Sequence, residues 1–424
     1  MNYNEALEYL NSRHTYGSKL GLERIRKLMY HLGDPQKSLK FIHIAGTNGK
    51  GSTSSFIFHM LKEAGYTVGL FTSQFIQRFT ERIQVVDKEI LNDEIAEIIT
   101  KIKLIIDTQW QDGESPTWFE VLTAMCFVHF KNKNCDIVVL EVGLGGDLDS
   151  TNVIDSSLVS VITTINYDHM EILGNTLEEI ASKKAGIIKE NGNVVVYPQE
   201  ERIINVIKNK CLKEGAKLQL VKDSDILPKE FSLFGQNFSY KDFSKLKIKM
   251  LGTHQVYNAA TAVETMLVLR QNGYNVTNQA IEDGLAKASW PGRLELISTD
   301  PLFLLDGAHN TQGANTLAQN IKLLCQNKEV ICIIGVLEHK EYKEMLVPFF
   351  SLSNKFITVT PKNDKALSST KLAEYIVSQG KIATPKDSVD LAIEYAISIS
   401  NRQTAICAFG SLYYIGEVRD YFGL

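Results

Sequence analysis

The sequence predicts an α/β fold in which helices alternate with the strands of a parallel sheet. Unbroken apolar runs within 136–142 and 158–165 are typical of parallel strands, which are buried on both faces. Segments with helical apolar spacing separate such runs along most of the chain. At 424 residues the chain is too long for one hydrophobic core, so two domains are expected.

The first part of the chain predicts the larger domain. Its apolar runs indicate strands at 40–45, 66–72, 136–142, 158–165 and 193–197. Apolar residues at helical spacing indicate helices at 2–12, 20–32, 52–64, 92–107, 118–130, 176–184, 200–214 and 254–272. The helix at 176–184 begins with a capping box formed by Thr176 and Glu179.

The second part predicts a smaller α/β domain. Short β-like runs within 217–252 indicate an antiparallel appendage, and the proline–glycine break at 289–293 indicates a junction. Strands follow at 302–305, 330–335, 355–360 and 404–409. We therefore expect domains at 1–292 and 299–424, joined by a linker at 293–298.

Composition limits the classes of function. The net charge is −4 and no long basic run interleaves with aromatic residues, so nucleic acid is not an expected partner. No apolar stretch reaches the ~20 residues of a membrane helix, and residues 1–14 do not resemble a signal peptide. The six cysteines include no Cys-x-x-Cys pair, which favours reduced thiols and a cytoplasmic protein.

A glycine-rich turn at 46–52, the phosphate loop, lies between a predicted strand and a predicted helix. Backbone N–H groups of such a turn can surround an anion, and the helix start adds its dipole. The dipole contributes only about 0.3–1 kcal/mol, so Lys50 must supply much of the charge. The glycine spacing departs from the strict P-loop pattern, and the alternative is a plain turn with a surface lysine. We interpret the turn as a nucleotide triphosphate site.

Polar residues follow three predicted strands of the first domain. Ser73, Glu141 and His169 each come after a different strand, where a parallel sheet presents its ligands. Mg²⁺ prefers oxygen ligands, so a hydroxyl and a carboxylate suit it, although the imidazole is unusual. Each residue taken alone is better explained as a hydrogen-bonded loop residue, but together, on the same face as the phosphate loop, they favour a Mg²⁺ site. The segment 72–83, the substrate loop, mixes aromatic and charged residues without periodicity, which suits a substrate-facing loop.

Two further positions have a structural explanation on the residues alone. Lys183 and Lys184 end a predicted helix, where cations offset the helix dipole, and this explanation is the favoured one for them. Asp306 follows a strand and precedes a helix, so it is equally suited to capping and to contacting a ligand.

Ten motifs together resemble the folylpolyglutamate synthases of the Mur ligase superfamily. They span about residues 40–415 in the family's order. The matching segments are 46–52, 72–73 with 81–83, 119–120 with 122–123, 141–146, 149–152, 168–169, 184–188, 291–293, 306–310 and 410–413.

This resemblance implies a P-loop ATPase domain with a parallel sheet, followed by a smaller Rossmann-like glutamate ligase domain. It implies an ADP-forming ligase that adds L-glutamate to the γ-carboxylate of a reduced folate through an acyl phosphate. ATP and Mg²⁺, the latter at two sites, are the implied cofactors. The expected partners are small molecules only (ATP, reduced folate and L-glutamate), and a monomer is expected.

The resemblance also implies roles for individual residues. Lys50, Lys184 and His309 are implied to be catalytic, and Lys184 matches a carbamylated lysine that would bind a second Mg²⁺. ATP contacts are implied for Thr47, Asn48, Gly49, Lys50, Gly51, Ser52, Asn258, Arg293 and Asp306. Metal contacts are implied for Ser73, Glu141, His169 and Lys184. Folate contacts are implied for Phe75, Arg82, Phe119, Glu120, Asp149 and Ser150, and glutamate contacts for Asp306, His309 and Ser411.

Departures from the family pattern bear on the substrate. Many relatives have Pro-His-Leu where this chain has Gln74, Phe75 and Ile76, and many have arginine at the position of Asp147. Losing a histidine and a cation from the presumed pterin region favours tail extension alone over a bifunctional dihydrofolate synthase. Alternatives from another class are a P-loop phosphotransferase and a nucleotide-sensing module. A ligase for cell-wall precursors fits the substrate loop less well.

Overall fold

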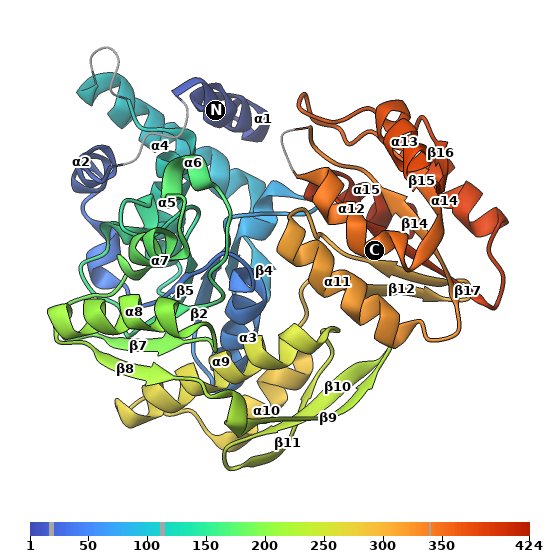
Figure 1. Ribbon diagram of the computed structural model, residues 1–424. Coiled ribbons are helices and arrows are strands. Elements are labelled where there is room, and N and C mark those ends of the chain that lie inside the picture. The colour runs from blue at the N-terminus through green and yellow to red at the C-terminus, as the bar shows by residue number, and fades with distance from the viewer. Residues whose placement is uncertain (17–20, 111–114, 339–340) are drawn as a thin grey trace. The chain divides into compact units, whose positions relative to one another are not determined.

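The computed structural model describes residues 1–16, 21–110, 115–338 and 341–424. Contacts divide the chain into two compact units (Figure 1). Unit 1 comprises 1–226 and 257–288, and unit 2 comprises 227–256 and 289–424. Of the expected appendage at 217–252, residues 227–252 therefore belong by their contacts to the second unit, whereas the sequence analysis placed the whole appendage in the first domain.

Unit 1 is built on an eight-stranded sheet in the order β4-β3-β2-β5-β1-β6-β7-β8. The strands are β1 (Phe41–Ala45), β2 (Val68–Phe71), β3 (Ile83–Val85), β4 (Lys88–Glu89), β5 (Ile137–Glu141), β6 (Val159–Ile162), β7 (Asn193–Val196) and β8 (Lys217–Leu220). All pairs from β2 to β8 are parallel, while β3 and β4 add an antiparallel edge. The residues 217–220, expected in the antiparallel appendage, are thus a parallel edge strand.

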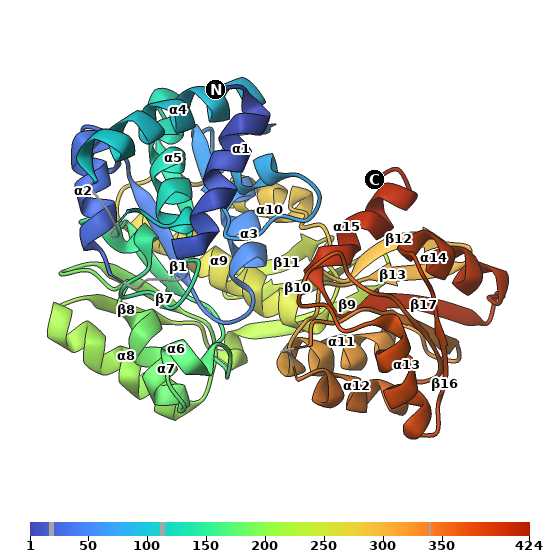
Figure 2. The ribbon, with the colours of Figure 1, turned by 90° about the horizontal axis from the view of Figure 1, so that it is seen from above.

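Helices cover both faces of this sheet. They are α1 (Tyr3–Ser12), α2 (Glu23–His31), α3 (Lys50–Glu63), α4 (Asn92–Gln109), α5 (Trp118–Asn132), α6 (Met170–Leu173), α7 (Leu177–Ala185), α8 (Glu201–Glu214), α9 (Thr253–Gln271) and α10 (Asn278–Lys287). Figure 2 shows α1, α4 and α5 gathered together, and their apolar faces share one core with Phe41, Phe71 and Leu140 of the sheet. Most predicted elements are confirmed, although Leu20 of the expected helix at 20–32 lies outside the described residues.

The helix α3, which follows the phosphate loop, packs between the sheet and another helix. It contacts β1, β2 and β5 on one side and α10 on the other. A Cβ on Gly284 of α10 would lie 2.4 Å from the Cα of Met60, so the absence of a side chain permits this backbone-to-backbone approach. The helix that follows the phosphate loop is therefore fixed on both sides.

Unit 2 contains two sheets. The strands β9 (Ile226–Ser232), β10 (Gly235–Tyr240) and β11 (Phe243–Ile248) form a three-stranded sheet, in which β10 and β11 are antiparallel. The second sheet has the order β12-β13-β17-β14-β15-β16. Its strands are β12 (Glu295–Thr299), β13 (Leu302–Leu305), β14 (Glu329–Ile334), β15 (Ser353–Thr358), β16 (Ile382–Pro385) and β17 (Thr404–Phe409), of which only β12 pairs antiparallel among the described residues.

The helices of unit 2 give it a doubly wound arrangement. They are α11 (Thr311–Leu324), α12 (Tyr342–Phe350), α13 (Ser369–Ser378), α14 (Val389–Ser398) and α15 (Leu412–Tyr421). Apolar residues of α11, α12 and α13 share one core with Cys332, Phe356 and Cys407 of the sheet. The helix α14 contacts α15, β14 and β15. This unit is the smaller α/β domain expected from the sequence.

Composition predicted reduced cysteines and gave no sign of a membrane helix. All six cysteines lie in the described part of the chain, and all are buried, free thiols. Across the residues that the structure describes, none of the helices combines the length and the apolar character that crossing a bilayer requires.

Candidate active site

The candidate site of unit 1 lies where four neighbouring parallel strands end. In the order β2-β5-β1-β6, these ends carry Ser73, Glu141, the phosphate loop and then Thr163 to His169. The carboxyl ends of parallel strands meet at one edge of a sheet and present ligand-binding groups there. The topology therefore brings the predicted phosphate and metal residues to the same edge.

Two close approaches shape the phosphate loop. A Cβ on Gly46 would lie 1.8 Å from the Thr163 hydroxyl, and a Cβ on Gly49 would lie 2.6 Å from the Asn258 amide oxygen. Gly49 also has φ +84°, a left-handed conformation that glycine adopts without strain. Glycine is required at both positions, and the structure places Asn258, a predicted nucleotide contact, against the loop.

Threonine hydroxyl groups, two just after β6 and one within the phosphate loop, hold this loop in place through hydrogen bonds. Thr163 and Thr164 donate to the carbonyl oxygen of Asn48 at 2.8 and 3.1 Å. The Thr47 hydroxyl donates to the Asn166 carbonyl and accepts from the Asn166 N–H, both at 3.0 Å. These bonds orient the loop backbone independently of any ligand. The loop would therefore need little reorganisation to bind an anion.

The loop leads directly into α3. The helix begins at Lys50, two residues earlier than predicted, and Gly49 caps it without a side-chain hydrogen bond. Gly51 and Ser52 therefore lie in the first turn. The N–H groups of a first helical turn have no partner within the helix, which makes this end suited to binding an anion.

The side-chain nitrogens of two lysines converge on one carbonyl oxygen of the loop. Lys50 Nζ donates to the carbonyl of Gly46 at 3.0 Å, and Lys184 Nζ donates to the same oxygen at 2.8 Å. Lys184 is only 4% exposed, and its burial lowers its pKa to about 7, with the nearby Lys50 cation acting in the same direction. Asp168 and Asp149 oppose this shift. A substantial share of neutral amine at physiological pH follows.

The geometry at the ends of β2 and β5 suits a hard cation. The Ser73 hydroxyl donates to Glu141 Oε1 at 2.9 Å, so two oxygen donors already lie side by side. His169 is exposed, has φ +47°, and its Nε2 lies 3.8 Å from Asp168 Oδ1. Within the described ranges, no group of three or more His, Cys, Asp and Glu side chains could hold a metal. The hydroxyl–carboxylate pair fits Mg²⁺, which takes oxygen ligands and retains several waters.

An aromatic cluster surrounds Arg82, which lies beside the Ser73–Glu141 pair. Its guanidinium carbon lies 4.9 Å from the ring centroids of Phe75 and Trp118 and 5.9 Å from that of Phe79. Arg82 is 8% exposed and donates to the carbonyl of Ser73, while the Phe75 ring is 37% exposed. Trp118 stacks on Phe119, whose ring centroid is 6.3 Å away. Three of the predicted folate residues, Phe75, Arg82 and Phe119, thus belong to one cluster.

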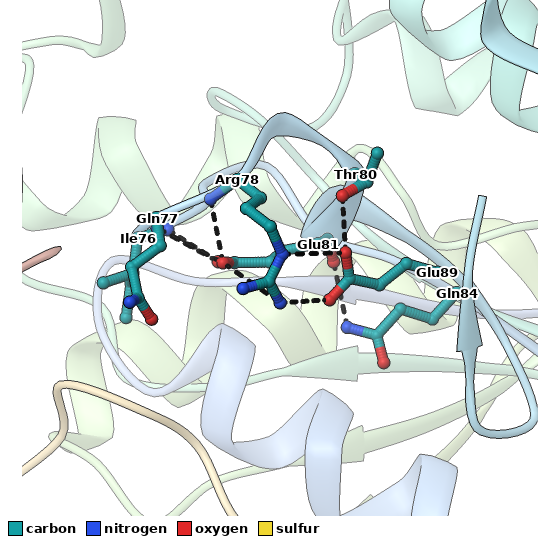
Figure 3. Close-up of polar contacts among 7 residues, drawn as sticks. All are labelled: Ile76, Gln77, Arg78, Thr80, Glu81, Gln84 and Glu89. Carbon is teal, nitrogen blue, oxygen red and sulfur yellow. Dashed lines mark hydrogen bonds and ion pairs between the residues drawn. The ribbon is translucent and has the colours of Figure 1, made fainter. Parts of the chain in front are cut away.

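Charged residues hold the rest of the substrate loop (Figure 3). The Glu81 carboxylate accepts from the backbone N–H groups of Ile76, Gln77 and Arg78. The Arg78 side chain pairs with Glu89 at 2.7 Å, and Glu89 also accepts from the Thr80 hydroxyl. The close-up shows the Glu81 carboxylate inside the turn and Glu89 outside it.

The remaining predicted folate residues take part in internal bonds. Asp149 accepts from the N–H groups of Leu144 and Thr151, and the Ser150 hydroxyl lies 2.6 Å from that of Thr123. Burial raises the pKa of Asp149. Glu120 Oε2 accepts from Thr117, completing a capping box, and from Arg24 Nε at 3.1 Å. These contacts give the residues structural roles, and their contacts with folate stay predictions.

The predicted residues of unit 2 gather at the ends of β13 and β17. These strands are parallel neighbours, so Asp306 and Ser411 follow adjacent strand ends. Asp306 accepts from the N–H groups of Leu294 and Ala308, both at 2.7 Å. Burial raises its pKa, while the charge of Arg293 opposes the rise. The imidazole of His309 donates from Nδ1 to the carbonyl of Gly307 at 2.8 Å.

Sequence reasoning missed several residues that shape these sites. Thr163 directly follows β6, but the predicted strand at 158–165 extended past it, so the strand-end criterion that selected Ser73 did not select Thr163. His43 lies buried in β1 with Nε2 2.9 Å from the Thr151 hydroxyl, which in turn donates to Asp149. Burial lowers its pKa to about 3, so it is neutral. An internal histidine on an apolar strand carries no sequence signal for such a link.

Known protein families and individual relatives match nearly the whole chain. The Mur ligase middle domain matches residues 44–266, and the Mur ligase glutamate ligase domain matches residues 292–412. The dihydrofolate synthase/folylpolyglutamate synthase of Bacillus subtilis is 37% identical over 98% of both chains. The folylpolyglutamate synthase of Lacticaseibacillus casei is 35% identical over 99% of this chain and 98% of its own.

A solved structure extends the similarity to the fold. The Mycobacterium tuberculosis folylpolyglutamate synthase, complexed with ADP and AMPPCP, has a TM-score of 0.89 and 29% identity, covering 100% of this chain and 99% of that one. Sequence and structural similarity therefore both extend through the two units. The chain belongs to the folylpolyglutamate synthase family of the Mur ligases.

Proposed function

We propose that this chain adds L-glutamate to the γ-carboxylate of a reduced folate, with ATP as the energy source. The ATP γ-phosphoryl group is transferred to the carboxylate oxygen, releasing ADP. The amino group of the incoming glutamate then attacks the acyl phosphate, loses a proton and displaces inorganic phosphate. The observation that carries the proposal is the convergence of Lys50 and Lys184 on Gly46, beside the Ser73–Glu141 oxygen pair.

The nucleotide is assigned to the phosphate loop. We assign the β- and γ-phosphates to Lys50 and to the N–H groups of the loop and the first turn of α3, with Thr47, Asn48, Gly49, Gly51 and Ser52 contributing. Preorganised donors of this kind stabilise the charge that develops during phosphoryl transfer. Asn258 lies against Gly49 and is assigned to the nucleotide, as are Arg293 and Asp306 of unit 2.

The metal is assigned to Ser73, Glu141 and His169. Mg²⁺ held by these residues would supply positive charge against the negative charge of the phosphates. The Ser73–Glu141 pair supports this assignment because its oxygens are the donors that Mg²⁺ prefers.

Lys184 is assigned as the carbamylated lysine that holds a second Mg²⁺. Its amine is buried and has a pKa of about 7, so it can react with CO₂ in its neutral form. The resulting anion would be stabilised by the adjacent Lys50 cation. Intact-protein mass spectrometry in bicarbonate should show an added mass that Lys184→Met lacks, and an unmodified lysine under all conditions would refute the assignment.

The organic substrates are assigned to separate groups of residues. Folate is assigned to Phe75, Arg82, Phe119, Glu120, Asp149 and Ser150, and the incoming glutamate to Asp306, His309 and Ser411. An aromatic face beside a buried guanidinium supports binding of a flat ring with an anionic tail. We further propose a cytoplasmic monomer.

The test is the substrate dependence of ATP turnover. We expect ADP release to require both tetrahydrofolate and L-glutamate, and product mass to rise by one glutamate residue. Equal turnover without glutamate would indicate a phosphotransferase, and none under any condition would indicate a binding module. Dihydropteroate tests the bifunctional alternative, which the name of the Bacillus subtilis relative supports. The replacement of Pro-His-Leu by Gln74, Phe75 and Ile76 favours tail extension alone.

A further inference from the structure

One carboxylate organises the backbone of the substrate loop from within. Glu81 Oε2 accepts from the N–H of Ile76 at 2.8 Å, and Oε1 accepts from those of Gln77 at 3.2 Å and Arg78 at 2.9 Å. The three donors are consecutive, so the loop closes around the anion (Figure 3). Hydrogen bonds to an ionised acceptor are roughly twice as strong as neutral ones.

The next residue fastens the other half of the loop. Arg82 donates to the carbonyl of Ser73 and lies against the ring of Phe75, and its own carbonyl accepts from the N–H of Thr72 at 2.9 Å. Glu81 holds 76–78, while Arg82 holds 72–75. The hydroxyl of Ser73, which donates to Glu141, therefore depends on both charges for its position.

The hydrogen bonds of the Glu81 carboxylate come from backbone N–H groups, and its ion pair with Arg78 is long. The Glu81 side chain is 20% exposed, and the Arg78 guanidinium lies 3.9 Å from Oε1. Glu89, eight residues later, provides a contrast because its carboxylate accepts from the side chains of Arg78 and Thr80. The two carboxylates lie in the same short segment, but Glu81 binds backbone N–H groups and Glu89 binds side chains. Glu89 therefore serves as a matched control.

We propose that Glu81 is a positioning residue for the folate substrate. Its charge fixes the turn at 76–78, and this turn sets the placement of Phe75 and Ser73. Glu81 itself contacts neither substrate nor metal in this scheme. The inference rests on the proposed function, because it takes the substrate loop to be the part of unit 1 that faces folate.

The experiment compares Glu81→Gln and Glu81→Asp with Glu89→Gln. Glutamine keeps one acceptor but places an NH₂ group against backbone donors, whereas aspartate keeps the charge on a shorter side chain. We expect Glu81→Gln to raise KM for tetrahydrofolate about tenfold and to leave KM for ATP within about twofold. Glu81→Asp should lie between wild type and Glu81→Gln. Glu89→Gln should change neither constant by more than about twofold.

A second measurement separates positioning from folding. Amide hydrogen exchange at 76–78 should accelerate in Glu81→Gln and stay unchanged in Glu89→Gln, with similar melting temperatures for both. Equal changes in the two KM values, or equal effects of both glutamine variants, would overturn the proposal. If Glu81→Gln does not fold, Glu81→Asp gives the same comparison. Absence of folate-dependent turnover in the wild type would instead refute the proposed function, and the exchange data would still report on Glu81.

Discussion

The phosphate loop and the substrate loop follow strands of the same sheet but are held in different ways. The phosphate loop is fastened from a neighbouring strand end, by Thr163 and Thr164, and by glycines that permit this approach. The substrate loop is fastened mainly by its own residues, Glu81 and Arg82, acting on backbone a few positions away.

Because of this difference, the two loops should tolerate sequence change to different degrees. A loop clamped by distant residues cannot change without disturbing the sheet, whereas a self-contained loop can change its exposed residues and keep its frame. The resemblance to the folylpolyglutamate synthases implies one departure within this loop, at 74–76, and another outside it, at Asp147. Residues 74–76 can therefore differ in their exposed side chains while Glu81 and Arg82 keep the backbone of the substrate loop in place.

The largest expected effect tests the phosphate loop. Lys50→Ala should lower kcat about 10²–10³-fold, the usual cost of removing one preorganised group that stabilises transition-state charge. Lys62→Ala, on the same helix and paired with Asp87 at the surface, is the control and should retain wild-type turnover. Steady-state kinetics with saturating folate measure both. A Lys50→Ala enzyme with normal kcat would remove the phosphate role.

The second effect concerns the buried amine beside the phosphate loop. The pKa of Lys184 is lowered from 10.5 to about 7, so the folded state binds fewer protons than the unfolded state between these values. The cost of burying the charge is greatest below pH 7 and is relieved as pH rises toward 10.5. In CO₂-free buffer, wild type should gain stability relative to Lys184→Met by up to about 1.4 kcal/mol per pH unit. Urea unfolding at pH 7, 8 and 9 measures this, and a constant difference would contradict the shift.

A smaller effect tests the clamp itself. Thr163→Val removes the hydroxyl that bonds the Asn48 carbonyl and should cost about 1 kcal/mol of stability while raising KM for ATP several-fold. Thr265→Val in α9 removes a buried hydroxyl that bonds the Thr261 carbonyl and is the matched control. It should cost similar stability without changing KM for ATP. Equal KM changes in both variants would mean that the hydroxyl of Thr163 has no special part in the loop.

The smallest effect belongs to the outside of the substrate loop. Arg78 is 61% exposed, and its ion pair with Glu89 should contribute at most about 0.2–1 kcal/mol. Arg78→Ala should therefore leave KM for tetrahydrofolate nearly unchanged, because the Arg78 backbone N–H that Glu81 binds is retained. Chemical denaturation and substrate titration measure the two quantities. A tenfold rise in KM would show that the loop is held by its surface charges instead.

The sequence predicted the frame of the fold better than its edges. Strands 302–305 and 404–409 were placed to the residue because unbroken apolar runs mark buried parallel strands. The strands β3, β4, β12 and β16 were missed, since they lie at or next to the edge of a sheet and are short or only partly buried. The strand β8 was placed in the wrong sheet for the same reason, being half-exposed at an edge.

The site was predictable where a rule links sequence position to place in the fold. Ser73 follows β2 and Glu141 ends β5, and the structure brings the Ser73 hydroxyl within 2.9 Å of Glu141 Oε1. The part played by Glu81 could not be predicted, because its partners are backbone N–H groups that any residue provides. The pKa of Lys184 likewise depends on burial against Gly46, which no local pattern encodes.

The discontinuous make-up of unit 1 has a practical consequence for dissecting the protein. A fragment that stops at Ala288 would carry 227–256 without the rest of their unit, including Asn320, which accepts from the N–H of Thr253 at 2.8 Å. Leu251 would likewise lose the core that it shares with α11. Neither unit can be obtained by a single cut, and a circularly permuted or internally shortened chain would be needed to study either one alone.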